Sequence, residues 1–402
     1  MSIPVQSQTR EIINQFLDAT KDKWIQVSHA IHDRPEIGNQ EFFACETHTK
    51  TLREYGFEVE VGIAGHETGF IARKKSTKTG PIIGFLAEYD ALPGLGHACG
   101  HNIIGTASVA AGIALGELIE NIGGEVVVFG TPAEEGGPNG SAKGSFVKAG
   151  YLQGVDACAM IHPSADSSTT TPSLAVDPLI FSFYGKPAHA AAAPEEGINA
   201  LDGVIQLYNG INALRQHLTD DVRIHGIISN GGEAPNIVPA YAEARFFLRA
   251  AKRSTLNKVT RKVKAIAEGA ALATGARVEI KPLQNEVDEL LPIASFDEVV
   301  AQELELLGET VARNSTKGIG STDAGNVSQV VPTVHAYIKI GPSDLVGHTD
   351  EFREAAKSPL GDAALLKSAK ALALSGYRLL TEPELLSTIQ KDFRKEKAKN
   401  VR

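Results

Sequence analysis

The strongest constraint on the fold of this chain is an alternation of short apolar runs with helix-like segments. The runs PIIGFLA, EVVVFG and ACAMI read as buried strands, and IIGTASVAAGIALGELIENI, between the first two, reads as a helix rich in small residues. Residues 9–32 and 41–55 also carry apolar positions at helical spacing. Strands that alternate with helices predict an α/β domain built on a mostly parallel sheet.

Each apolar run is followed by polar residues that can carry chemistry. In open parallel sheets, ligands bind beyond the carboxyl ends of the strands. We therefore expect the residues that follow these runs to converge at one edge of the sheet. They are Asp90, Cys99, His101, Glu134, Glu135 and His162.

The composition and the pattern of apolar residues change near residue 165. The segment SADSSTTTPS is a candidate linker, and the pattern after it predicts a compact β-α-β-β-α-β block, with Ser254 as N-cap of its second helix. A helix at 295–308 follows, and strand and loop patterns return at STDAGNVSQVVPTVHAYIKIG. We expect an α/β domain formed by residues 1–172 and 288–402, interrupted at 173–287 by a smaller α+β domain of split βαβ, ferredoxin-like type.

The amino-acid composition limits the kinds of binding partner and the cellular compartment that we expect for this protein. With 43% hydrophobic residues the chain can bury a sizeable core, and a net charge of -9 argues against nucleic acid or an anionic membrane as partner. No signal-peptide pattern and no apolar stretch of about 20 residues is present. Three cysteines, Cys45, Cys99 and Cys158, are too few for a disulfide framework. We expect a cytoplasmic protein.

Two motifs point to a metal centre. In HACGHN, Cys99 and His101 flank a glycine, and a thiolate with an imidazole suits Zn²⁺, Mn²⁺, Co²⁺ or Ni²⁺. In PAEEGG, one of the adjacent carboxylates can bind metal while the other acts as general base. Taken singly, each motif also fits a structural turn or a solvated acidic loop. His162 in MIHP and His348 in LVGHTDEF also fit a core and a surface histidine, respectively.

Other mechanisms find less support. The sequence contains no G-x-S-x-G, no G-x-x-x-x-G-K-[ST] and no H-E-x-x-H. A nucleophilic pair of Cys99 and His101 stays possible in principle, although residues two apart in a tight turn more easily share a metal.

Several motifs in order resemble one enzyme family. HDRPEIGNQE, DALPGLGHACGHN, GTPAEEGG, MIHP, GKPAHAAAAPEEGINALD, APNIVPAYAEARFFLR and GHTDEF resemble the aminoacylase/glutamate-carboxypeptidase family of di-metal peptidases, in its amidohydrolase branch. The match spans roughly residues 30–355. The form GHACGHN is most similar to the aminobenzoyl-glutamate hydrolase and dipeptidase-like subgroup.

The resemblance implies roles for the matching residues. Cys99 would bridge two divalent metal ions, His101 and His162 would complete one site, and Glu135 and His348 the other. Glu134 matches the catalytic base. Asp90 matches a carboxylate that orients a ligand. Glu88 departs from the carboxypeptidase branch, which has a metal-binding histidine there, and is not counted as a ligand.

The interrupting domain would be the family's lid and dimerisation domain. His189 matches a residue that reaches across a homodimer to the substrate carbonyl, and Asn236 and Arg249 match residues that hold the substrate's carboxylate end. The implied activity is hydrolysis of the amide bond of an N-acyl amino acid, with a dipeptidase as the alternative. A catalytically silent binding protein and a thiol hydrolase are the rivals from other classes.

Overall fold

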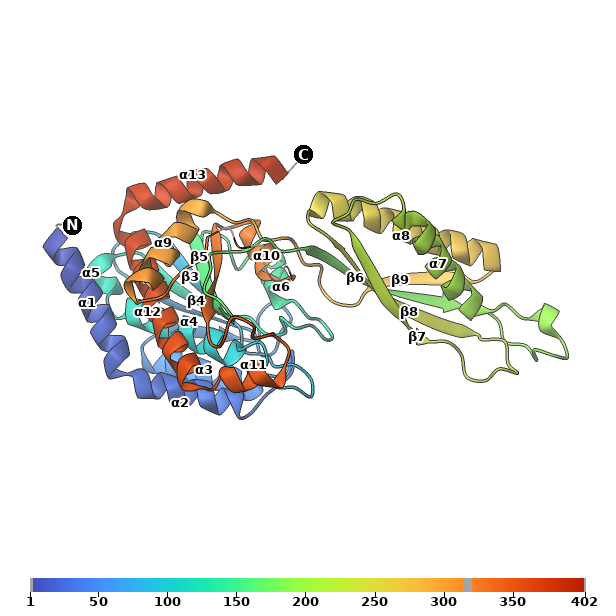
Figure 1. Ribbon diagram of the computed structural model, residues 1–402, viewed down its shortest axis with the longest axis horizontal. Helices are drawn as coiled ribbons and strands as arrows, with labels where there is room; N and C mark the ends of the chain where they lie inside the picture. The colour runs from blue at the N-terminus through green and yellow to red at the C-terminus, as the bar shows by residue number, and fades with distance from the viewer. Residues whose placement is uncertain (1–2, 314, 316–319, 401–402) are drawn as a thin grey trace. The chain divides into compact units, whose positions relative to one another are not determined.

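The computed structural model describes residues 3–313, 315 and 320–400 and divides the chain into two compact units. The larger unit runs to Pro172 and resumes at Leu290, and the smaller one is Ser173–Glu289. Figure 1 follows the chain through both units. Each unit has its own hydrophobic core. Among the described helices, none has the length and apolar character needed to cross a bilayer.

The larger unit is built on one mixed sheet of order β1-β2-β4-β3-β5-β10. The strands are β1 (Glu58–Val61), β2 (Phe70–Lys75), β3 (Ile82–Ala87), β4 (Glu125–Gly130), β5 (Ala157–Ser164) and β10 (Thr333–Lys339). The pairs β3–β4, β3–β5 and β5–β10 are parallel, whereas β1–β2 and β2–β4 are antiparallel. The predicted mostly parallel sheet is confirmed.

Helix α4 is the central helix of this unit. All of its residues are buried, and it contacts β3, β4 and β5. Its glycines allow a close approach, because a Cβ at Gly105 would lie 2.5 Å from the carbonyl oxygen of Glu88 and one at Gly112 would lie 2.4 Å from Val128. The small residues of the sequence thus bring the N-terminus of α4 to the end of β3.

The other helices of the larger unit enclose this core. Their bounds, with that of α4, are α1 (Ile3–Ala19), α2 (Lys21–His32), α3 (Phe42–Glu54), α4 (His101–Gly116), α5 (Ile119–Ile122), α6 (Ala142–Lys148), α9 (Ala294–Leu306), α10 (Ala324–Ser328), α11 (Asp350–Ala355), α12 (Pro359–Thr381) and α13 (Pro383–Asn400). The prediction of a single helix over 9–32 is wrong, because the helix is interrupted at Thr20 and the segment forms α1 and α2. The Thr20 hydroxyl donates to the Phe16 carbonyl at 2.7 Å, which competes with the helical backbone ladder.

The segment SADSSTTTPS is a packed part of the larger unit and not an exposed linker. Its residues from Ser167 to Thr171 are buried. Ser168 forms isolated bridges to Ala312 and Tyr337, and the Thr170 hydroxyl donates to Asp297 at 2.6 Å. Hydrogen bonds to these short polar side chains make their burial tolerable, which composition alone does not reveal.

The smaller unit is an antiparallel sheet with two helices. Its elements are β6 (Ala175–Tyr184), η1 (Pro194–Glu196), α7 (Ala200–Arg215), β7 (Arg223–Asn230), β8 (Tyr241–Ala250), α8 (Arg253–Thr274) and β9 (Arg277–Pro282), with strand order β7-β8-β6-β9. Helices α7 and α8 pack on each other and on the sheet (Figure 1). The predicted α+β order is confirmed.

The start of α8 differs from the prediction. Ser254 lies inside the helix, whose N-cap is Lys252. Glu289 accepts the backbone N–H of Arg253 at 2.9 Å, so a carboxylate distant in sequence caps this end.

Candidate active site

The HACGHN segment forms the turn that leads into α4. Gly100 is the N-cap of α4 in a left-handed conformation, with φ of 74°. A Cβ there would lie 2.8 Å from the Pro163 ring, so the turn requires glycine. Cys99 precedes the turn and His101 begins the helix, which places both side chains at the carboxyl end of the sheet.

Asp90 fixes the orientation of His101. Its Oδ1 lies 2.9 Å from Nδ1 of His101, and its Oδ2 accepts the backbone N–H of Glu135 at 2.9 Å. With Nδ1 donating to Asp90, Nε2 points into the site, where a bound metal ion would take the place of its proton. Nε2 lies 3.5 Å from Glu88 Oε2 and 3.8 Å from Glu135 Oε1. Burial lowers the pKa of His101, but Asp90, Glu88 and Glu135 raise it more, so in the metal-free protein it lies well above its usual value.

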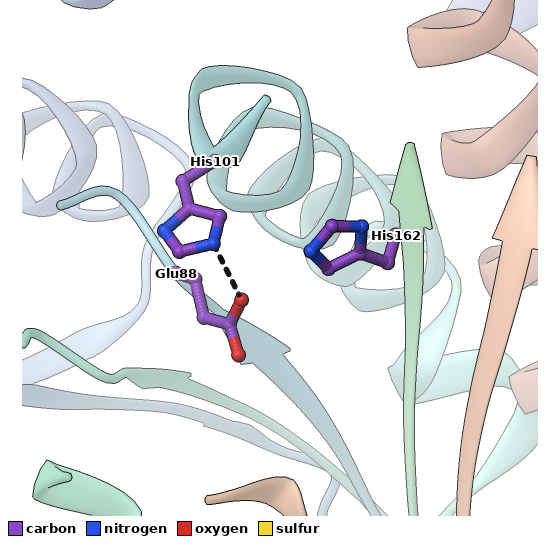
Figure 2. A group of neighbouring side chains, drawn as sticks. All are labelled: Glu88, His101 and His162. Atoms are coloured by element: carbon purple, nitrogen blue, oxygen red, sulfur yellow. Dashed lines mark ion pairs between the residues drawn. The ribbon is translucent and has the colours of Figure 1, made fainter. Parts of the chain in front are cut away.

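Glu88, His101 and His162 form a deeply placed group of potential ligands, one of four overlapping groups among the described residues. One ligand atom from each lies within 4.8 Å of the others, and the three side chains point toward one another from the residue after β3, from α4 and from β5 (Figure 2). His162 Nδ1 donates to the Pro163 carbonyl at 2.7 Å, which leaves Nε2 as a lone-pair donor. Burial, together with His335 and His101, lowers the pKa of His162 to about 3. The ring is therefore neutral, as a metal ligand must be.

Cys99, Glu135 and His348 form the second group, which is more open to solvent. Their ligand atoms also lie within 4.8 Å of one another, and His348 Nε2 is 3.7 Å from Glu135 Oε1. The side chain of His348 is 60% exposed. Its backbone is left-handed, with φ of 61°, and its N–H donates to the Ala98 carbonyl at 3.1 Å. Such strained backbone in a non-glycine residue often occurs at functional sites.

Glu134 lies beside both groups. It shares one cluster with His101 and Glu135. The preceding Ala133 adopts φ of 56°, and its N–H donates to Glu41 at 2.9 Å, which fixes the loop. Burial, followed by the charges of Glu88 and Glu135, raises the pKa of Glu134 well above its usual value. A carboxyl with this tendency to hold a proton is suited to general acid–base chemistry.

Sequence reasoning missed a buried ion-pair cluster behind this site. Lys143 on α6 is fully buried, and its Nζ lies 2.6 Å from Glu88 Oε1 and 2.5 Å from Asp323 Oδ1. Neither residue could be recognised from the sequence. Lys143 lies in a segment without a known motif, and Asp323 lies in STDAGNVS, which was interpreted only as part of the fold. Burial raises the pKa of Glu88, but Lys143 and the nearby histidines lower it to about 2, so Glu88 is ionised.

The two groups suit divalent cations. At Zn–N, Zn–O and Zn–S bond lengths of about 2.0–2.3 Å, the edge of a tetrahedral ligand set is about 3.3–3.7 Å, close to the separations observed among Glu88, His101, Glu135 and His348. The Nε2 atom of His101 and the Oε2 atom of Glu88 are buried without a hydrogen-bond partner. Among the described residues, the ammonium that pairs with the carboxylates of the centre is that of Lys143. These carboxylates belong to Glu88, Asp90, Glu134, Glu135 and Asp323.

The thiol of Cys99 is poorly placed for a free nucleophile. Burial and the charge of Glu135 raise its pKa far above the usual value in the metal-free protein. The Nε2 atom of His101 that would accept its proton faces Glu88 and Glu135. A thiol nucleophile needs the opposite environment, one rich in positive charge.

The remaining predicted residues belong to the smaller unit. His189 is exposed, and its Nδ1 accepts the backbone N–H groups of Ala191 and Ala192 at 3.2 and 3.1 Å. Asn236 lies beside it, since its carbonyl accepts the N–H of Ala190 at 3.0 Å. Because Nδ1 accepts, Nε2 carries the ring proton and can donate to a ligand.

Arg249 is not near this pair within one subunit. It lies late in β8, paired with Val176 and Arg223, roughly 26 Å along the strand from Tyr241 at about 3.3 Å per residue. His189 and Asn236 lie at the other end of the same sheet, next to the start of β8. Arg249 Nε lies 3.2 Å from His225 Nε2. The two substrate-binding residues expected from the motifs therefore occupy opposite ends of this unit.

The fold and the motifs together define a class of peptidases and amidohydrolases. The model of a peptidase dimerisation domain matches residues 179–274. A human Xaa-Arg dipeptidase is 36% identical to this chain over 94% of the chain and 91% of its own length. One of the subunits of the p-aminobenzoyl-glutamate hydrolase of Escherichia coli (strain K12) is 34% identical over 74% of the chain and 65% of its own length.

A solved structure shares the fold. A Bacillus subtilis protein described as a dinuclear metal-binding peptidase of the M20 family superimposes with a TM-score of 0.61 and 22% identity, over 88% of this chain and 98% of that one. The chain belongs to the M20 family of peptidases and amidohydrolases. The resemblance read from the motifs is thereby confirmed.

Proposed function

We propose that this protein is a dinuclear metal-dependent amidohydrolase that releases a free amino acid from an N-acyl amino acid or a dipeptide. The observation that carries the proposal is the convergence of the Cys99–Glu135–His348 group and the His101–His162 pair at the carboxyl end of one sheet. Glu134 stands beside both groups as the general base. A silent binding protein would have no chemical need for that half-buried carboxyl.

The residues of the site divide the catalytic work. Two divalent cations held by these ligands would polarise the scissile carbonyl and acidify a water molecule. Cys99, a member of the more open group, would be the ligand that bridges the two cations. Glu134 takes the proton of the attacking water and passes it to the leaving amine. Asp90 orients His101 and, through the Glu135 backbone, the loop that carries both glutamates.

The smaller unit supports a homodimeric site. Edge strand β7 exposes most of its residues, including Ile227 and Ile228, and the domain model that matches this unit describes dimerisation. His189 and Asn236 lie at one end of the sheet and Arg249 at the other. We infer that His189 serves the metal centre of the partner subunit, with Asn236 beside it. Arg249, near the point where the chain enters this unit, serves a different end of the substrate.

Two substrate classes are favoured by the relatives. The human relative is named for dipeptides with C-terminal arginine, and the Escherichia coli relative for aminobenzoyl-glutamate. Both are amides of a free amino acid, which fits one basic side chain, Arg249, as the carboxylate partner. Zn²⁺ and Mn²⁺ are the proposed metals, with Co²⁺ and Ni²⁺ as alternatives, and the cytoplasm is the proposed compartment.

Metal removal tests the proposal directly. We expect chelation to abolish hydrolysis across a panel of N-acyl amino acids and dipeptides, including Xaa-Arg, and Zn²⁺, Mn²⁺ or Co²⁺ to restore it. The panel then ranks the two substrate classes by kcat/KM. A chelated preparation, shown by metal analysis to be metal-free, that kept full activity would remove the metal mechanism and favour the thiol one.

Alkylation of Cys99 tests the bridging thiolate. A coordinated thiolate is shielded from electrophiles, whereas the metal-free thiol has a raised pKa and reacts faster as the pH rises into the alkaline range. We expect iodoacetamide to label Cys99 in the apoprotein at alkaline pH and metal to suppress the labelling. Cys45 and Cys158, both buried, are internal controls in the same mass spectra. Rapid labelling of Cys99 in the active metal-loaded enzyme would contradict the bridge.

A further inference from the structure

We propose that Glu88 is a ligand of the cation held by His101 and His162, coordinating through Oε2 while Oε1 stays paired with Lys143. This inference rests on the proposed function and extends it, because it gives the deeper ion a carboxylate ligand at a position where no metal ligand was expected.

The spacing of Glu88 and Asp90 places one carboxylate at each nitrogen of the same imidazole. Both residues follow β3, and residues two apart in extended chain point to the same side. Tyr89 points elsewhere, and its hydroxyl donates to the Thr68 carbonyl. Asp90 takes Nδ1 of His101 at 2.9 Å, and Glu88 faces Nε2 at 3.5 Å (Figure 2).

The geometry of Glu88 and His101 suits a cation between them. Nδ1 of His101 donates to Asp90, so a cation that displaced the Nε2 proton would meet a neutral imidazole whose Nε2 lone pair lies beside the carboxylate oxygen of Glu88. The separation of 3.5 Å exceeds the 2.7–3.2 Å, or about 2.9 Å on average, of an N–H···O hydrogen bond. Both atoms are buried without a hydrogen-bond partner. A metal ion that replaces the Nε2 proton would bind Nε2 of His101 and Oε2 of Glu88 together, and His162 Nε2 lies near enough to supply a third donor.

Lys143 holds Glu88 in place without consuming the second oxygen. The ammonium lies 2.6 Å from Oε1 of Glu88 and 2.5 Å from Oδ1 of Asp323. Asp323 Oδ2 accepts the backbone N–H of Lys143 at 3.0 Å, so both oxygens of Asp323 are committed to Lys143. One positive charge thus serves two buried carboxylates, which leaves negative charge on the Oε2 side of Glu88. The cluster of Glu88, Glu134 and Asp323 already contains its cation in Lys143.

The test is metal binding by Glu88→Gln, measured apart from activity. Apoprotein is titrated with Co²⁺ in a competing chelator, with stoichiometry from metal analysis and coordination from the visible absorption of the bound ion. We expect the wild type to bind two ions and Glu88→Gln to bind one of them at least about 100-fold more weakly, since even changes behind a ligand cost about 10–100-fold. The d–d bands of the weakened ion should shift, and the thiolate-to-Co²⁺ charge-transfer band of Cys99 should remain.

Two further variants separate coordination from charge. Asp323→Asn also neutralises a buried carboxylate on Lys143, but this carboxylate pairs with Lys143 and not with a proposed ligand. We therefore expect an unchanged Co²⁺ spectrum and a loss of affinity no greater than the lower end of the range for groups behind a ligand, about 10-fold. Glu88→Asp keeps the charge but withdraws the oxygen by one methylene. It should fold even if Glu88→Gln does not, and it should also weaken one ion and shift its bands. Circular dichroism and thermal unfolding check the fold of each variant.

The outcomes are distinct. Wild-type binding and spectrum in both Glu88 variants, or equal losses with unshifted spectra in Glu88→Gln and Asp323→Asn, would show that Glu88 is only a charge partner of Lys143. Either result would leave the proposed function intact. A wild-type protein that binds no divalent ion would overturn the proposed function and this inference together.

Discussion

Replacing Glu134 by glutamine should lower kcat by about 10²–10⁴-fold while both metal ions remain bound. The amide is close in size to the carboxyl but cannot accept the proton of the attacking water. Glu134 belongs to the cluster with His101 and Glu135 but is not needed as a ligand in either metal group. The measurement is kcat/KM for the best substrate of the panel, together with metal content on the same preparation.

Glu135→Gln is the matched control for Glu134→Gln. It changes the adjacent carboxylate in the same loop, by the same chemistry, but removes a proposed ligand of the Cys99–Glu135–His348 group. We expect it to lose metal as well as activity. Equal metal loss in the two variants, or full turnover in Glu134→Gln, would contradict the assigned roles.

Replacing His189 by alanine should lower turnover by about 10²–10³-fold, the effect of removing one donor to a developing oxyanion. In the structure Nδ1 accepts two backbone N–H groups, so Nε2–H is held outward and available to donate. Metal content should stay at the wild-type value, because His189 lies in the other compact unit from the metal groups. The dimer mass should also stay, because the substitution removes only one exposed imidazole. His217→Ala, an exposed histidine of the same unit, should keep wild-type activity.

Mixing the two inactive variants tests whether His189 acts across the dimer. In a mixed dimer the metal centre of the His189→Ala subunit keeps Glu134 and receives His189 from the Glu134→Gln subunit, so one of the two sites is intact. Random exchange of equal amounts makes half of the dimers mixed and should return about a quarter of wild-type activity. If mass spectrometry shows exchange and no activity returns, His189 does not act across the interface.

Much of the fold and of the candidate site can be predicted from local sequence patterns. Short apolar runs predict β3, β4 and β5, because a buried parallel strand needs little more than a run of apolar residues. The polar residues that follow each run predict that the site lies at one edge of the sheet, because the carboxyl ends of parallel strands meet at the same edge. Gly100 is readable as a turn residue between Cys99 and His101. The spacing of these features also carries the family resemblance.

Tertiary structure alone decided which charges meet. Lys143 and Asp323 are 180 residues apart and belong to no motif, yet both are buried against Glu88. The same is true of the buried polar segment before the smaller unit and of the opposite placement of Asn236 and Arg249. A sequence period reports which side of a strand or helix a residue faces, because that depends on the local backbone. The partner that a buried charge finds depends on the packing of distant elements, where desolvation makes such pairing obligatory.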